Sequence, residues 1–213
     1  MSRPRFDAPV VALDIDGTLG DYHGHFIRFA EQYLGRELPD PYAVTGGIPL
    51  YKYLHITRTT YRQVKLAYRQ GGMKRSMPVY DGAADLTKLI RKNGCQVWIC
   101  TTRPYLRLDN IDPDTRHWLH RHKIQYDAVL FGDHKYRDLR DAVGVERVMF
   151  VADDLPDMLG QAAGLGMRTV LRRQPYNMGE SYGNDHEVND LKELEEVFRK
   201  EFVIYHERRQ QSH

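Results

Sequence analysis

The chain has 213 residues, a formal net charge of +2 at pH 7 and 41% hydrophobic residues. This length and composition suit one sizeable domain, or a core with an insertion, around a buried interior. The basic residues are scattered along the chain, which argues against a nucleic-acid partner, and no apolar run approaches the roughly 20 residues that a membrane-spanning helix needs. The N-terminus has no apolar signal-peptide core, so we expect a cytoplasmic protein.

The two cysteines, Cys95 and Cys100, are five positions apart around a predicted strand. Side chains alternate between the two faces of a strand, so an odd spacing sends the two thiols to opposite faces. A disulfide between them is therefore not expected, and buried reduced thiols agree with a cytoplasmic protein.

The first element is an apolar run rich in β-branched residues, which begins at Val10 and predicts a buried strand. It ends abruptly in two carboxylates, Asp14 and Asp16, and Gly17 and Thr18 follow. Side chains two positions apart on a strand point to the same side, so we expect Asp14 and Asp16 to lie together. Ligands of open α/β sheets bind at this carboxyl edge of the sheet.

A small helical cap is predicted to follow the first strand, over residues 21–78. Apolar side chains recur at helical spacing from Phe26 to Leu34, and a second helix is predicted over 57–70. The prolines and glycines between them predict turns and loops.

From Val79 onward, strands and helices alternate. Strands are predicted over 95–100, 126–131, 147–152 and 167–171, and helices over 83–92, 112–122, 136–143, after 154, and over 189–206. This alternation predicts a parallel sheet with helices on both faces, which is a three-layer Rossmann-like α/β fold. We expect a discontinuous core of residues 1–20 and 79–188, the cap of residues 21–78, and a C-terminal helix and tail of residues 189–213.

Polar side chains follow three of the predicted strands where each one ends. The residues are Asp14 and Asp16, Thr101 and Thr102, and Asp153 and Asp154, and Lys135 precedes the last of these strands. Parallel strands bring these ends to one edge, where closely packed carboxylates repel one another unless a cation lies among them. Oxygen ligands of this kind suit Mg²⁺, and a hydroxyl and an ammonium group can hold phosphate oxygens.

These motifs, in this order, resemble those of the haloacid dehalogenase-like superfamily of phosphatases. The resemblance rests on Asp14-Ile15-Asp16-Gly17-Thr18, on Thr101 after CQVWIC, on Lys135, and on Asp153-Asp154-Leu155-Pro156-Asp157. The segments DIDGTLGDYHGHF, WICTTRP and DDLPD, with a helical cap after the first motif, are most similar to the 5'(3')-deoxyribonucleotidase-like branch. The polynucleotide kinase 3'-phosphatase domain is a looser match.

The resemblance implies Mg²⁺-dependent hydrolysis of a phosphate monoester through an aspartyl-phosphate. Asp14 would attack phosphorus, and Asp16 would protonate the leaving oxygen, then deprotonate the attacking water, and reach the metal through its backbone carbonyl. Asp154 is favoured over Asp153 as a further metal ligand, although the opposite assignment is open. The phosphoryl group would be held by two residues, Thr101 and Lys135.

The substrate is expected to be a small phosphate ester, most simply a nucleoside or deoxynucleoside monophosphate. Phe26, Tyr51 and Tyr53 could stack on a nucleobase, or they could instead form the core of the cap. Thr102 and Arg103 follow the second motif and are further candidates for binding the substrate.

Three alternatives stay open at this point. The chain could act on a nucleic-acid 3'-end or on another small phosphate ester, and a signalling receiver module also places an acidic pocket, a Thr and a Lys around a phospho-aspartate. The apolar stripe of the predicted C-terminal helix could pack on the core or on a second copy in a homodimer.

Overall fold

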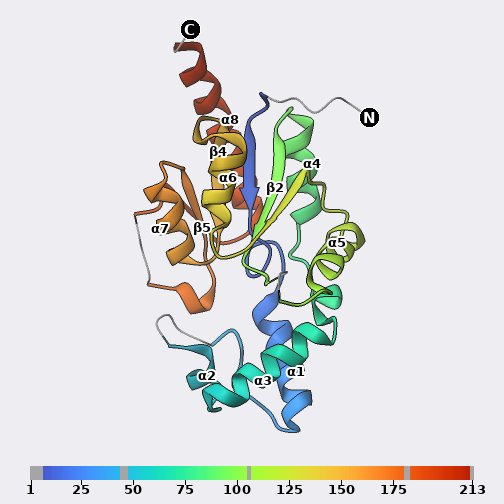
Figure 1. Cartoon of the computed structure of the whole chain (residues 1–213). Coiled ribbons are helices and arrows are strands. Elements are labelled where there is room, and N and C mark those ends of the chain that lie inside the picture. Colours follow the sequence, from blue (N-terminus) through green and yellow to red (C-terminus); the bar gives the residue numbers. More distant parts are fainter. Residues whose placement is uncertain (1–6, 44–47, 105–106, 180–182, 212–213) are drawn as a thin grey trace.

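The structure is a computed structural model and describes residues 7–43, 48–104, 107–179 and 183–211. Its centre is a six-stranded sheet in the order β3-β2-β1-β4-β5-β6, in which every neighbouring pair is parallel (Figure 1). The strands are β1 (Val10–Leu13), β2 (Gln96–Thr101), β3 (Ala128–Phe131), β4 (Val148–Asp153), β5 (Thr169–Arg172) and β6 (His186–Val188). The predicted three-layer α/β fold with a parallel sheet is confirmed.

Helices cover both faces of the sheet because successive strand residues, which point to opposite faces, are mostly apolar. Val11 and Leu13 of β1 face a cluster with α4 (Ala83–Lys92), α5 (Ile111–Arg121) and α8 (Leu191–Gln211). Val10 and Ala12 face the opposite cluster, with α6 (Lys135–Val143) and α7 (Pro156–Gly164). Cys95 and Cys100 belong to these two different clusters, and both are free and buried, as their spacing predicts.

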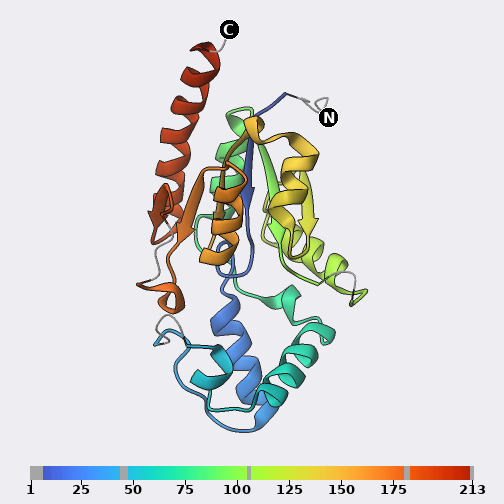
Figure 2. The same ribbon diagram turned by 60° about the vertical axis from the view of Figure 1, so that its left-hand side comes forward.

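The main differences from the predicted elements lie at the C-terminal end of the chain. The strand β6 has only three residues, too few for an alternating pattern to be recognisable in the sequence. The helix α8 extends to Gln211, and its end projects beyond the body of the molecule (Figure 2). Its residues Leu191, Leu194 and Phe198 pack on the sheet, so this part of the stripe covers the core. Homodimerisation stays a prediction.

Between β1 and α4, the chain forms the helical cap. It contains α1 (Tyr22–Leu34), α2 (Leu50–Tyr53), α3 (Arg58–Gln70) and a short 3₁₀ helix, η1 (Met73–Ser76). The Asp21 carboxylate accepts a hydrogen bond from the Gly24 N–H at the start of α1, and the Thr57 hydroxyl accepts one from the Thr60 N–H at the start of α3. The cap lies beyond the edge where the strands end (Figures 1 and 2).

The cap has an apolar core of its own, made by α1, α3 and the residues between them. Its fully buried members are Phe26, Ile27, Ala30, Leu54, Val64 and Tyr68. This smaller core gives the cap a defined shape beyond the sheet edge, and it leaves the side chains on the neighbouring face of α3 free to face the sheet. Within the described ranges, the structure contains no helix of the length and apolarity that crossing a membrane requires.

Candidate active site

The order of the strands reverses between β1 and β4, and this point positions the candidate site. The chain runs outward from β1 through β2 to β3, and from β4 through β5 to β6. Ligands of open α/β sheets bind where the strand order reverses, at the carboxyl ends of the strands. Asp14 directly follows β1, whereas Asp153 ends β4 and Asp154 follows it.

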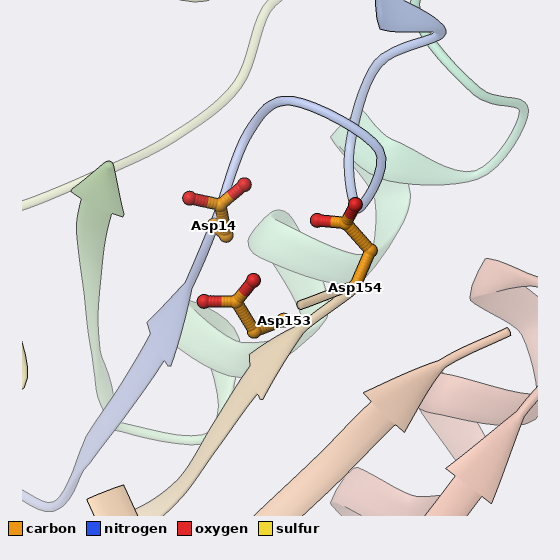
Figure 3. Close-up of side chains that lie close together, drawn as sticks. All are labelled: Asp14, Asp153 and Asp154. Carbon is orange, nitrogen blue, oxygen red and sulfur yellow. The ribbon is translucent and has the colours of Figure 1, made fainter. Parts of the chain in front are cut away.

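Three carboxylates come together at this point. One oxygen each of Asp14, Asp153 and Asp154 lies within 4.8 Å of the others, and all three residues are buried (Figure 3). Two strands far apart in sequence supply them because β1 and β4 are adjacent in the sheet. This grouping could hold a metal ion, and its oxygen-only donors are the ligands that Mg²⁺ prefers.

Lys135, at the start of α6, lies among these carboxylates. Its Nζ atom is 2.6 Å from Oδ1 of Asp14 and 2.7 Å from Oδ2 of Asp153, and the side chain is almost fully buried. The two carboxylates raise the pKa of Lys135 against the opposing effect of burial. The ammonium group therefore stays charged and holds Asp14 and Asp153 in place.

Asp153 and Asp154 have different surroundings. Oδ2 of Asp153 accepts from the Tyr136 hydroxyl at 2.6 Å, and Oδ1 accepts from the Leu155 N–H at 3.0 Å. Asp154 accepts from two hydroxyl groups, those of Thr18 and Tyr176. Burial and the carboxylates of Asp153 and Asp14 raise the pKa of Asp154 well above its usual range. Asp154 therefore has the stronger need for added positive charge.

The pKa of Asp14 is raised to about 7, mainly by burial, although the charge of Lys135 acts in the opposite direction. Only one of its two carboxylate oxygens, Oδ1, accepts a hydrogen bond from a described residue. The other oxygen, Oδ2, has no such partner and belongs to a residue that lines the cavity below.

Asp16 lies apart from these three carboxylates, which corrects the expectation that Asp14 and Asp16 share one side of a strand. The strand ends at Leu13, and Asp16 lies in the tight turn that follows. Oδ1 of Asp16 accepts from Arg103 Nη2 at 2.6 Å, and Oδ2 is paired with Lys74 of η1. Burial alone would raise the pKa of Asp16, but these two cations lower it.

Gly17 is the residue that allows this turn to pass so close to Asp154. Its φ angle is +96°, which side-chain-bearing residues rarely adopt. A Cβ atom at this position would collide with the Asp154 carboxylate and the Tyr176 hydroxyl. The glycine in the first motif is therefore needed for both the backbone conformation and the space.

A cavity of about 210 Å³ separates the sheet edge from the cap. The predicted site residues that line it are Asp14, Asp16, Thr102, Arg103 and Asp154. The remaining lining residues are Leu155 and seven residues of the cap: Tyr22, His23, Leu50, Tyr61, Lys65, Arg69 and, in η1, Lys74. Lys135 and Asp153 lie behind this surface, and so does Thr101, the buried last residue of β2.

Arg103 is held by Asp16 and by the buried residue Thr115. Besides its contacts with Asp16, its Nη1 atom donates to the Thr115 hydroxyl at 3.0 Å, and only 2% of the residue is exposed. Lys74, the other partner of Asp16, was not anticipated from the sequence, because it follows Asp16 by 58 residues in a short cap segment without a motif. Burial lowers the pKa of Lys74 to about 7, against the opposing charge of Asp16.

Of the two alternatives for Phe26, Tyr51 and Tyr53, base stacking or the core of the cap, the contacts of these residues favour a structural role in the cap. Phe26 is fully buried in the cap core. The Tyr53 hydroxyl donates to the Asp40 carbonyl at 2.6 Å, and Tyr51 packs near the ring of Tyr61. None of the three lines the described part of the cavity, and periodicity alone could not distinguish the two faces of the cap helices.

His23 contacts the site from the first turn of α1. Its ring stacks on Tyr176 with centroids 3.8 Å apart, and its Nδ1 atom is buried without a hydrogen-bond partner among the described residues. Burial lowers the pKa of His23 to about 4, so the ring is neutral at pH 7. Tyr176 in turn donates to Asp154, and His23 therefore connects the cap to the carboxylates.

The similarity of this chain to known proteins lies in its three-dimensional structure. No protein-family model matches the chain, and no curated protein matches its sequence. Solved structures match it over most of its length. The first is described as a predicted phosphatase from Clostridium acetobutylicum, with a TM-score of 0.65 and 15% identity over 91% of this chain and 99% of that one.

Two further structures extend this similarity. A haloacid dehalogenase-like family hydrolase from Streptococcus pneumoniae has a TM-score of 0.62 and 16% identity, over 90% of this chain and 99% of that one. CbbY from Rhodobacter sphaeroides, in complex with xylulose-(1,5)bisphosphate, has a TM-score of 0.60 and 17% identity, over 88% and 96%.

The chain shares the fold of these structures. At these identities the similarity establishes the fold alone, and the deoxyribonucleotidase-like branch is not shown. This fold places Asp14 and Asp154 on one side of the cavity and the cap on the other.

Proposed function

We propose that the protein is a Mg²⁺-dependent phosphate monoester hydrolase that works through an aspartyl-phosphate. The observation that carries the proposal is the position of Asp14. It follows β1 at the point where the strand order reverses, Lys135 binds one of its oxygens, and it lines the cavity together with Asp154. A carboxylate fixed by an ammonium group on one oxygen can attack phosphorus with the other.

In this proposal, Oδ2 of Asp14 forms a bond to phosphorus while the bond from phosphorus to the ester oxygen breaks. Water then attacks the phosphorus of the aspartyl-phosphate, and the Asp14 carboxylate is regenerated. Lys135 holds Oδ1 of Asp14 in place, and Thr101, which is buried at the end of β2, is proposed to contact the phosphoryl group. Two steps of moderate barrier replace one difficult step.

Asp16 is the proposed proton carrier of both steps. Its pairing with Arg103 and Lys74 favours the ionised form and makes Asp16 a weak base. Protonating the leaving oxygen and then taking a proton from the attacking water both require a higher pKa of Asp16, and therefore the release of at least one of these cations before the first step. Lys74 belongs to the cap segment, so movement of the cap would change the acidity of Asp16.

The three carboxylates fit Mg²⁺ because burial and mutual repulsion raise the pKa values of Asp14 and Asp154, which a cation would reverse. Asp14 and Asp154 are the proposed side-chain ligands, with the Asp16 carbonyl. Asp153 would stay with Lys135 and Tyr136, which already occupy Oδ2. When bound, Mg²⁺ neutralises charge between the carboxylate and the phosphate.

The substrate is proposed to be a small phosphorylated metabolite. The cavity volume of about 210 Å³ is below the ~300–1,000 Å³ of pockets for drug-sized ligands. The CbbY structure holds a sugar bisphosphate. Nucleoside monophosphates remain within the proposal because two tyrosines, Tyr22 and Tyr61, line the cavity and offer aromatic faces.

The test is an assay of phosphate release from a panel of sugar phosphates and of nucleoside monophosphates, with a 3'-phosphorylated oligonucleotide as a further member. Each substrate is assayed with Mg²⁺ and with an excess of chelator. We expect turnover of at least one small ester with Mg²⁺ and its loss with chelator, which added Mg²⁺ restores. Phosphorylation of Asp14 without turnover would instead indicate a receiver-like module, and no release from any member would refute the hydrolase.

A further inference from the structure

The helix α3 presents one polar stripe to the cavity. Tyr61, Lys65 and Arg69 are four residues apart, a spacing that places them on one face of a helix, and all three line the cavity. Val64 and Tyr68, on the neighbouring face, are fully buried in the cap core. The packing of the apolar face therefore fixes which side chains of α3 face the sheet edge.

The two cations of this stripe, Lys65 and Arg69, have no acidic partner among the described residues, unlike the other cations of the site. Lys74 and Arg103 pair with Asp16, but neither Lys65 nor Arg69 forms an ion pair with any described residue. The one hydrogen bond of the Lys65 ammonium group within the described structure is to the Tyr61 hydroxyl, at 3.4 Å. The side chain of Arg69 has no such bond there, and both residues are only partly exposed.

The cavity wall is an unfavourable place for these two charges. Burial, together with the charge of Arg69, lowers the pKa of Lys65 to about 8. The other basic residues of α3, Arg58 and Arg62, are exposed, and neither lines the cavity. A pair of partly desolvated cations without a carboxylate is stabilised when an anion binds between them, and guanidinium groups favour two-pronged binding of phosphate or carboxylate.

We propose that Lys65 and Arg69 form a second anion subsite, which binds an acidic group of the substrate other than the phosphate that reacts at Asp14. This subsite rests on the proposed function and restricts the class of substrate. The substrate class is a small phosphate monoester with a second phosphate or a carboxylate. The reacting phosphate lies against the strand ends, and the second group lies against α3, where the Tyr61 hydroxyl is a further donor.

The experiment measures binding separately from turnover. Full-length Asp14→Asn protein is titrated in the presence of Mg²⁺ with two matched pairs of ligands by calorimetry. Glucose 1-phosphate and glucose 1,6-bisphosphate differ by a second phosphate, whereas glycerol 3-phosphate and 3-phosphoglycerate differ by a carboxylate. In at least one pair, we expect the doubly acidic member to bind about tenfold more tightly or better. The pair with the larger difference identifies the second group.

The same titrations are repeated after single substitutions on α3. Arg69→Gln and Lys65→Gln should each reduce the preference for the doubly acidic ligand about tenfold, with little change for the singly acidic one. Arg69→Lys should restore part of the preference, and Arg62→Gln, at an exposed residue of the same helix that does not line the cavity, should leave it unchanged. Thermal unfolding of every variant checks that the cap is folded.

Equal binding within both pairs would overturn the subsite, as would the absence of binding by every ligand. An equal loss for both members of a pair after Arg69→Gln would also overturn it. The proposed function is judged separately, by phosphate release from the unsubstituted protein. A preference for the second acidic group without turnover would keep the subsite and refute the hydrolase, and turnover without such a preference would do the reverse.

Discussion

The two sides of the cavity are built differently. On the strand-end side, Lys135 contacts two carboxylates, and Asp153 accepts hydrogen bonds from Tyr136 and from the backbone of Leu155. On the cap side, Lys65 and Arg69 have almost no polar partners among the described residues. Groups that are already paired are held in one geometry, whereas unpaired ones gain most from a ligand. The strand-end side therefore suits catalysis of phosphate ester hydrolysis, and the cap side suits binding of the substrate.

The largest expected effect is on the strand-end side. Asp14→Asn removes the proposed nucleophile with little change in shape, so kcat for phosphate release should fall by about 10³-fold or more. The measurement is steady-state kinetics with the best substrate of the panel, with circular dichroism as a check of folding. Asp109→Asn, the same change at an exposed position, should leave kcat unchanged. Turnover by Asp14→Asn at the normal rate would refute Asp14 as the nucleophile, and with it the catalytic role of the strand-end side.

A smaller effect is expected inside the cap. Phe26→Ala leaves a cavity in the cap core, which should lower the free energy of unfolding by about 3–5 kcal/mol. Because Phe26 does not face the substrate cavity, KM for a nucleoside monophosphate and for a small sugar phosphate should change by the same factor. Urea denaturation and kinetics with both substrates test this. Tyr33→Ala, at a residue that is 53% exposed, is the control and should cost well under 1 kcal/mol.

Selective loss of nucleotide affinity in Phe26→Ala would contradict the position of Phe26 in the interior. It would return the aromatic residues of the cap to a direct role in binding.

The smallest effect concerns His23, where the two sides meet. In the folded state its pKa is lowered to about 4, whereas an unfolded histidine titrates near pH ~6.5. The neutral ring therefore stabilises the fold fully above pH ~6.5, and this contribution is lost as the pH falls toward 4. Because the ring is partly exposed, we expect the loss of unfolding free energy between pH 7 and 5 to be about 1 kcal/mol smaller in His23→Gln than in the unsubstituted protein.

Urea denaturation at the two pH values measures this difference. His120→Gln, at an exposed histidine of α5, should retain the full pH dependence. An unchanged pH dependence in His23→Gln would show that His23 is not the group whose protonation weakens the fold.

The sheet and its acidic edge could be predicted because local patterns dictate them. The apolar run that starts at Val10 is buried on both faces, and such runs form strands of parallel sheets. Carboxylates that follow two strands must meet if those strands are neighbours, and Asp14 and Asp154 do so. The place where each strand ends was less predictable: β1 ends at Leu13, so Asp16 lies in the following turn and apart from the other carboxylates.

The order of residues along the chain was sufficient to define the parallel α/β fold, the acidic edge and the presence of a cap, because these depend on spacing within short segments. Which cations surround Asp16, and which faces of the cap helices meet the cavity, depended on the tertiary structure. Lys74 lies 58 residues beyond its partner, and the stripe of Tyr61, Lys65 and Arg69 is identified only once Val64 and Tyr68 are seen to fill the cap core. Long-range packing decides such contacts, and no local pattern encodes it.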